Sequence, residues 1–196
     1  MVVDDNVQRI ADVSQEHGLH VAVAESLTSG AVASRLGAGP EAADWFRGGV
    51  VAYDERVKFD VLGVTPGPLV TERCAREMAE GVARMLGGDA TIGVTGVGGP
   101  EPSEGKAVGT VIAAVCAWGG GTQPRLSLSR ESRGRHLSLC GSGCGPVGGG
   151  SDLRGGNRLI SPRLRPRGCQ RACRRRSTDR VALAILDLRN SGSRPR

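Results

Sequence analysis

The 196-residue chain is poor in aromatic side chains and in lysine. Phe, Trp and Tyr make up 3% of its residues, and only two lysines are present, Lys58 and Lys106. No apolar run approaches the roughly 20 residues that a membrane-spanning helix needs. Residues 1–5 are acidic and lack the pattern of a signal peptide. We therefore expect a cytoplasmic protein that does not contact a membrane.

The charge of the chain divides it into two segments. Residues 1–119 contain 9 Lys and Arg against 16 Asp and Glu, whereas residues 120–196 contain 17 Arg, no Lys and 4 acidic residues. The first segment has the apolar content of one modest α/β domain. The second is rich in Gly, Ser, Arg and Pro, and it buries too little apolar surface to offset its ordering entropy. We expect a folded domain followed by a low-order basic tail.

Apolar periodicity predicts alternating helices and strands in the first segment, which favours an α/β fold. Gly18 is a good helix stop, and Thr71 is a natural N-cap for the clearest amphipathic helix. Cys74 and Cys116 are expected to be reduced core thiols. The predicted elements, in chain order, are a helix over 5–17, a strand over 21–24, a helix over 28–37, a strand over 48–53, helices over 54–62 and 71–86, and strands over 91–95 and 108–115.

The junction after the first predicted strand is the most informative segment. The apolar run 21–24 stops at a cluster of hydroxyl side chains, Ser26, Thr28 and Ser29, and a helical pattern follows. Such a junction presents hydroxyl and backbone N–H groups at one point, which suits a phosphate or another anion. It also suits a nucleophilic serine at the carboxyl end of a strand. Alternatively, Ser26 or Thr28 is simply a helix N-cap.

Four segments, in order, resemble one family. They are AESLTSG at 24–30, GGVVAY at 48–53 with Lys58 and Leu-Gly-Val at 62–64, TGVGGP at 95–100 and KAVGTV at 106–111. Together they resemble the CinA C-terminal domain family, the nicotinamide-nucleotide amidases, over about residues 5–118.

The resemblance implies an α/β fold, which we expect as a three-layer sandwich with a mixed central sheet and flanking helices. It also implies hydrolysis of the amide of nicotinamide mononucleotide to nicotinic acid mononucleotide and ammonia, and a homo-oligomer. We expect no cofactor, and since residues 1–118 contain no clustered metal ligands, no metal.

The resemblance assigns the nucleophile to Ser26 and the general base to Lys58. A serine hydroxyl is a weak nucleophile until a base takes its proton, and burial lowers the pKa of a lysine far enough for it to act as that base. The histidines do not suit this role, because His17 and His20 precede the first strand near a turn and His136 lies in the basic tail.

Further residues of the matching segments are candidates for substrate binding. Thr28, Ser29 and Gly30 are expected to donate hydrogen bonds to the phosphate or to the oxyanion. Thr95, Gly96 and Gly98 form a second glycine turn that lets the backbone approach a ligand, or is only a turn. Tyr53 is expected to contact the pyridine or ribose, or merely to pack. Glu25 is expected to orient Lys58 or to bind a ribose hydroxyl, or it is a solvated carboxylate. Lys106 is expected to touch the phosphate or to close a loop.

The chain departs from the family pattern near these residues. Leu27 and Ser29 replace a cysteine and a glycine, and Asp54 and Glu55 replace Ser-Asn after the tyrosine. A serine at position 29 is unfavourable if the backbone there needs a positive φ. Two carboxylates repel a phosphate if they point inward. One alternative function is therefore a catalytically impaired member that still binds nucleotides.

The tail is the largest departure, because residues 120–176 do not resemble the family's last strand, Gly-Asp-Arg turn and helix. A change of reading frame near residue 120 is one hypothesis, since residues 126–136 can be back-translated so that a one-base shift encodes CPFPGNREAVI. A functional tail is the rival, with zinc half-sites at Cys140-x3-Cys144 and Cys169-x3-Cys173 and arginines that attract polyanions, including nucleic acid. The tail has no aromatic residue for base stacking. One short helix is expected over 181–188.

Overall fold

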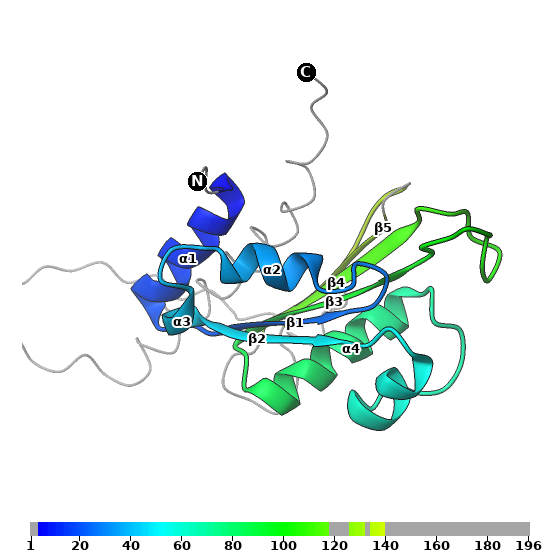
Figure 1. Ribbon diagram of the computed structural model, residues 1–196, viewed down its shortest axis with the longest axis horizontal. Coiled ribbons are helices and arrows are strands. Elements are labelled where there is room, and N and C mark those ends of the chain that lie inside the picture. Colours follow the sequence, from blue (N-terminus) through cyan, green and yellow to red (C-terminus); the bar gives the residue numbers. More distant parts are fainter. Residues whose placement is uncertain (1–3, 118–125, 132–133, 140–196) are drawn as a thin grey trace, which may run out of the picture.

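A computed structural model describes residues 4–117, 126–131 and 134–139 (Figure 1). The elements in chain order are α1 (Asp5–His17), β1 (Val21–Glu25), α2 (Ala31–Gly37), α3 (Ala42–Trp45), β2 (Phe46–Val51), the π-helical turn η1 (Val57–Val61), α4 (Glu72–Leu86), β3 (Ala90–Gly96), β4 (Val111–Ala117), β5 (Leu126–Glu131) and β6 (Gly134–Leu139).

The strands form one mixed sheet in the order β2-β1-β3-β4-β5-β6. β1 pairs in parallel with β2 and β3, and the pairs β3–β4, β4–β5 and β5–β6 are antiparallel. α1, α2 and α3 lie on one face of the sheet and α4 on the other (Figure 1). This arrangement confirms the expected three-layer α/β architecture. Within the described ranges no helix is long and apolar enough to cross a membrane.

β1 separates two hydrophobic clusters, because alternate residues of a strand point to opposite faces. Val21 and Val23 belong to the cluster that α1, α2 and α3 cover, with Ile10, Leu36 and Trp45. Ala22 and Ala24 belong to the cluster on the α4 face. The members of that second cluster are Ala22, Ala24, Ala52, Leu62, Val64, Cys74, Met78 and Val82.

α4 lies close to the sheet because β3 presents a glycine to it. A Cβ atom added at Gly93 would lie 1.9 Å from the carbonyl oxygen of Ala75 in α4. Both ends of α4 follow the sequence, since the hydroxyl of Thr71 accepts the N–H of Cys74 at 3.1 Å and Gly87 ends the helix with φ 69°. Cys74 and Cys116 are buried free thiols, as expected.

The predicted order of helices and strands is confirmed over residues 5–117, with shifted ends. The predicted strand over 108–115 begins only at Val111, because the preceding residues belong to the β3–β4 connection. α3 was not predicted, and it is a single turn of four residues.

The sheet also continues past the predicted end of the domain. β5 and β6 extend it beyond residue 119, into the segment whose composition predicts a low-order tail. The predicted cysteine pairs of the tail and its helix over 181–188 lie outside the described residues.

Candidate functional site

The site residues gather at the carboxyl ends of the three parallel strands. β2, which follows β1 in the sequence, lies on one side of β1 in the sheet, and β3 lies on its other side. The strand order therefore changes direction between β1 and β3, which is where open α/β sheets bind ligands. Ser26 lies at this switch point, and its N–H donates to the carbonyl of Val94 in β3 at 3.0 Å.

Ser26 continues the alternation of β1. Ala22 and Ala24 belong to the cluster on the α4 face, and the backbone hydrogen bond to β3 extends the strand ladder by one residue. The alternation therefore directs the side chain of Ser26 toward the α4 face. Ser26 is 9% exposed, so it lies just below the surface.

Lys58 lies on the same face and near the same edge. It is 3% exposed, and its neighbours Val57 and Phe59 in η1 pack against the α4-face cluster. Its Nζ donates to the carbonyl of Tyr53 at 3.5 Å, just beyond the carboxyl end of β2. The adjacent Ala52 donates its N–H to the carbonyl of Glu25 at 2.6 Å. Lys58 is thus anchored to the chain segment that lies beside Ser26.

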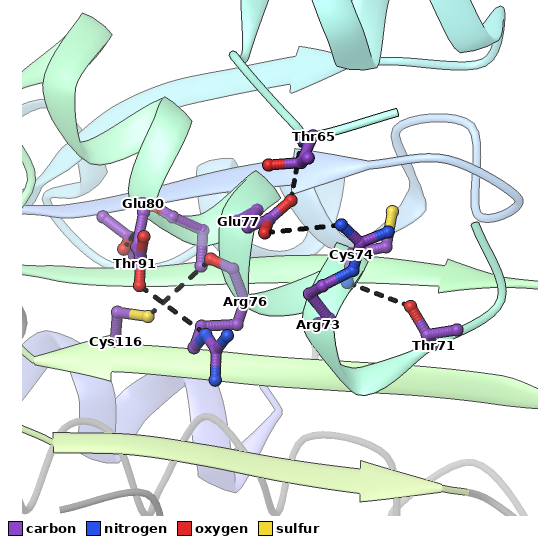
Figure 2. Close-up of polar contacts among 10 residues, drawn as sticks. Thr65, Thr71, Arg73, Cys74, Arg76, Glu77, Glu80, Thr91 and Cys116 are labelled. Atoms are coloured by element: carbon purple, nitrogen blue, oxygen red, sulfur yellow. Dashed lines mark hydrogen bonds and ion pairs between the residues drawn. The ribbon is translucent and has the colours of Figure 1, made fainter. Parts of the chain in front are cut away.

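Burial of Lys58 lowers its pKa below the ordinary lysine value, and the nearby Cys74 and Glu55 partly oppose this shift. The thiol of Cys74 is buried in turn, and burial raises its pKa to about 11. Figure 2 shows Cys74 in the first turn of α4, where its N–H bonds to Thr71. At neutral pH the thiol therefore stays protonated, and Lys58 is the group of this pair whose shift favours proton transfer.

Glu25 does not orient Lys58 and is not solvated, contrary to two of the expectations for it. The residue is 1% exposed, and its carboxylate accepts the backbone N–H groups of Gly30, Val32 and Ala33 at 3.2, 3.0 and 2.7 Å. The alternation of β1 places it on the α2 face, opposite Ser26. Its oxygens are occupied by the start of α2, so a ribose hydroxyl would have to compete with three existing hydrogen bonds.

Two of the predicted phosphate or oxyanion donors already have partners. The N–H of Ser29 donates to the carbonyl of Ser26 at 3.0 Å, and the N–H of Gly30 donates to Glu25. Both residues have a left-handed backbone, with φ 50° at Ser29 and φ 97° at Gly30. Position 29 therefore does require a positive φ, and Ser29 meets this requirement at a cost in strain.

The donors that remain in this loop belong to Leu27 and Thr28. Among the described residues, neither backbone N–H group has a hydrogen-bond partner. The Oγ1 atom of Thr28 is buried and likewise has no partner in the described part of the chain. Buried polar atoms are usually paired, so an unpaired hydroxyl beside the switch point is a candidate ligand contact. Thr28 therefore stays a candidate ligand-binding residue, because its hydroxyl is buried and, within the described ranges, unpaired.

The second glycine turn divides into structural and candidate residues. Thr95 is 2% exposed and donates its hydroxyl proton to the carbonyl of Leu69 at 2.9 Å, so it holds the loop before α4 rather than a ligand. Gly96 has φ 157°, and a Cβ there would lie 2.2 Å from the carbonyl oxygen of Thr110, so it is required by packing. A Cβ at Gly98 would lie 3.9 Å from that of Leu27, which places Gly98 beside the serine loop.

Tyr53 does not pack into the core, because it is 71% exposed next to Lys58. Asp54 is directed toward Arg56, whose backbone N–H and Nε donate to its carboxylate at 2.8 and 3.2 Å. These hydrogen bonds from Arg56 lower the pKa of Asp54. Its charge is therefore shared with a cation, which weakens the expected repulsion of a phosphate.

Lys106 lies near the tip of the β3–β4 connection. Its backbone N–H and carbonyl both pair with Ser103, which closes a tight hairpin. The backbone of Lys106 therefore has the loop-closing role, which is one of the two roles considered for this residue.

Glu104, in the same hairpin, was not predicted to matter. Its carboxylate accepts the N–H groups of Leu69 and Val70 at 2.8 Å each and so holds the hairpin against the loop before α4. The only sequence signal was a Glu-Gly pair in a turn.

Known proteins resemble the chain over most of the described residues. The sequence profile of the CinA C-terminal domain matches residues 4–139. A CinA-like protein of Frankia casuarinae is 47% identical over 96 residues, which is 46% of this chain and 22% of that protein. A CinA-like protein of Synechocystis is 39% identical over 136 residues, or 64% of this chain and 33% of that protein. The chain spans a third or less of the length of the curated relatives it matches.

Solved structures show the same fold. The crystal structure of a competence-damaged protein (CinA) superfamily protein from Klebsiella pneumoniae superposes with a TM-score of 0.62 at 22% identity, and the match covers 97% of this chain and 99% of that one. A competence or damage-inducible protein from Enterobacter asburiae gives a TM-score of 0.62 at 23% identity, with 96% and 99% covered.

Proposed function

The chain belongs to the CinA C-terminal domain family, and from this premise we propose that it is an amidohydrolase that converts nicotinamide mononucleotide and water to nicotinic acid mononucleotide and ammonia. One observation carries the proposal. Ser26 follows β1 at the switch point of the sheet, and the alternation of β1 directs its side chain to the α4 face, which is also where the buried Lys58 with its lowered pKa lies. A serine hydroxyl becomes an effective nucleophile when an adjacent base, here a neutral lysine, accepts its proton.

In the proposed reaction, the Oγ atom of Ser26 attacks the carboxamide carbon of the substrate, and Lys58 accepts the hydroxyl proton on Nζ. The carbon–nitrogen bond then breaks, and Lys58 returns the proton to the departing amine, which leaves as ammonia. Water then attacks the ester carbon while Lys58 accepts a proton from it. The bond to Oγ of Ser26 breaks, Lys58 returns the proton to Oγ, and nicotinic acid mononucleotide leaves. Burial of Lys58 supports both steps, because it increases the fraction of neutral amine.

The oxyanion of the tetrahedral intermediate is assigned to the donors left over in the serine loop. These are the N–H groups of Leu27 and Thr28, supported by the hydroxyl of Thr28. Donors aimed at the developing charge commonly account for a factor of about 100–1,000 in kcat. Exposed Tyr53 is assigned to the pyridine ring or ribose, and Gly98 and Lys106 to the far end of the substrate.

Product analysis tests this function. The purified full chain is incubated with nicotinamide mononucleotide, and ammonia and nicotinic acid mononucleotide are measured together. We expect equal amounts of both products, and less turnover with nicotinamide riboside, which lacks the phosphate. Folded protein that forms neither product would refute the amidase.

One observation supports a second candidate, a catalytically impaired member that binds the nucleotide. Ser29 has a left-handed backbone, which strains the loop that holds the nucleophile. Binding of nicotinamide mononucleotide by calorimetry, without ammonia release, would favour this candidate.

A further inference from the structure

We propose that Glu25 is a positioning residue that fixes the serine loop in the conformation needed for attack, an inference that rests on the proposed amidase function. Glu25 does not touch the substrate in this account. It acts through the backbone of the loop that carries Ser26 and the oxyanion donors.

The carboxylate of Glu25 connects the end of β1 to the start of α2. Its Oε1 atom accepts the N–H of Ala33 at 2.7 Å, and its Oε2 atom accepts those of Val32 and Gly30 at 3.0 and 3.2 Å. The loop 26–30 therefore leaves Glu25 and returns to it within a few residues. A side chain that is 1% exposed loses much of its conformational freedom, so both ends of this loop are held in place.

The backbone of the same residue is held from both sides of the sheet. The carbonyl of Glu25 accepts the N–H of Ala52 at 2.6 Å, and the next N–H, that of Ser26, donates to Val94 at 3.0 Å. The nucleophile is thus joined to β2, to β3 and, through the Glu25 side chain, to α2. Among these three attachments only the one through Glu25 depends on a side chain, so only this one can be removed cleanly by substitution.

The charge of Glu25 also determines which loop groups are available to a ligand. α2 is short, and its first N–H groups would otherwise attract an anion. Glu25 accepts those of Val32 and Ala33, and the N–H of Ala31 donates to the carbonyl of Thr28, which leaves Leu27 and Thr28 as the donors near the nucleophile. The carboxylate therefore directs the substrate's developing charge to one place in the loop.

A glutamine at this position has the same shape and lacks the required acceptors. In one orientation its NH2 group faces the N–H of Ala33, and in the other it faces those of Gly30 and Val32, so at least one hydrogen bond is replaced by a donor–donor contact. Small displacements of reacting groups reduce rates by about 100-fold. Glu25→Gln is therefore the informative variant.

The matched control is Glu77→Gln. Glu77 also accepts a loop N–H, that of Thr65, at 2.8 Å (Figure 2), and it lies on α4, outside the proposed catalytic and binding machinery. Both variants and the unaltered full chain are assayed with nicotinamide mononucleotide, and amide hydrogen exchange is followed in the peptides that cover 26–33.

We expect Glu25→Gln to lower kcat about 10- to 100-fold with KM changed less than threefold, and to speed exchange over 26–33 while the rest of the domain keeps its protection. Glu77→Gln should keep kcat within about twofold and leave exchange over 26–33 unchanged. A purely structural role would instead speed exchange throughout the domain without a selective loss of kcat.

The inference is overturned if Glu25→Gln retains kcat within threefold, or if exchange over 26–33 matches that of the control. Failure of the proposed function looks different, because the unaltered chain then releases no ammonia. In that case the exchange result alone decides whether Glu25 holds the loop.

Discussion

Replacing Ser29 with glycine should stabilise this protein, which is unusual for a change at the edge of a candidate active site. Ser29 has φ 50°, in the left-handed region, and its side chain is exposed. A non-glycine residue there costs about 1–2 kcal/mol. Glycine relieves this strain and adds about 0.4–1 kcal/mol of conformational entropy to the unfolded chain. The net expectation is a gain of about 0.5–1 kcal/mol, or about 2–5 °C in Tm.

Ser34→Gly is the matched control for this prediction. Ser34 is also exposed and lies five residues further on, inside α2, where the backbone is helical. Glycine is a poorer helix former than serine by about 0.5 kcal/mol, so the same chemical change should lower Tm there. Thermal and urea unfolding of both variants, followed by circular dichroism, measure the two shifts. The reasoning fails if Ser29→Gly lowers Tm by as much as Ser34→Gly.

Two further predictions concern Lys58 and Gly93. Because burial lowers the pKa of Lys58 from its ordinary 10.5, kcat should rise with pH through this lowered value, and Lys58→Met should abolish both the activity and this rise. Between the lowered pKa of Lys58 in the folded protein and its ordinary pKa in the unfolded chain, the unfolded chain binds more protons than the folded protein. The free energy of unfolding should therefore increase with pH in that window, and urea titrations of Lys58→Met should lack the increase. Gly93→Ala should destabilise the domain by about 1–3 kcal/mol or more, because its Cβ would lie 1.9 Å from the carbonyl oxygen of Ala75, and an unchanged urea midpoint would contradict this packing.

The sequence was sufficient to predict the elements that precede the site, because their signals are local. The apolar run over 21–24 predicts β1, and the hydroxyl cluster after it predicts where the strand ends. Local patterns did not show which face each residue takes. The sequence left three roles open for Glu25, namely to orient Lys58, to bind a ribose hydroxyl or to be solvated. The structure instead places it on the α2 face, where it accepts N–H groups of the next helix.

Contacts between distant segments could not be predicted either, because sequence patterns report only on neighbouring residues. The hydroxyl of Thr95 bonds to Leu69, which lies 26 residues earlier, and no motif signals that contact. β5 was missed for another reason, since its Leu-Ser-Leu-Ser stretch alternates with the period of a strand. The pattern is short, and the Gly-, Ser- and Arg-rich composition around it predicts a low-order segment instead.

The most direct test of the central claim is ammonia release from nicotinamide mononucleotide by the full chain and by Ser26→Ala, with Ser34→Ala as the matched serine control. The account predicts release by the unaltered chain and by Ser34→Ala, and a loss of at least about 1,000-fold in kcat for Ser26→Ala, because the covalent route needs its Oγ atom. Turnover that persists in Ser26→Ala at the rate of the unaltered chain would contradict the account.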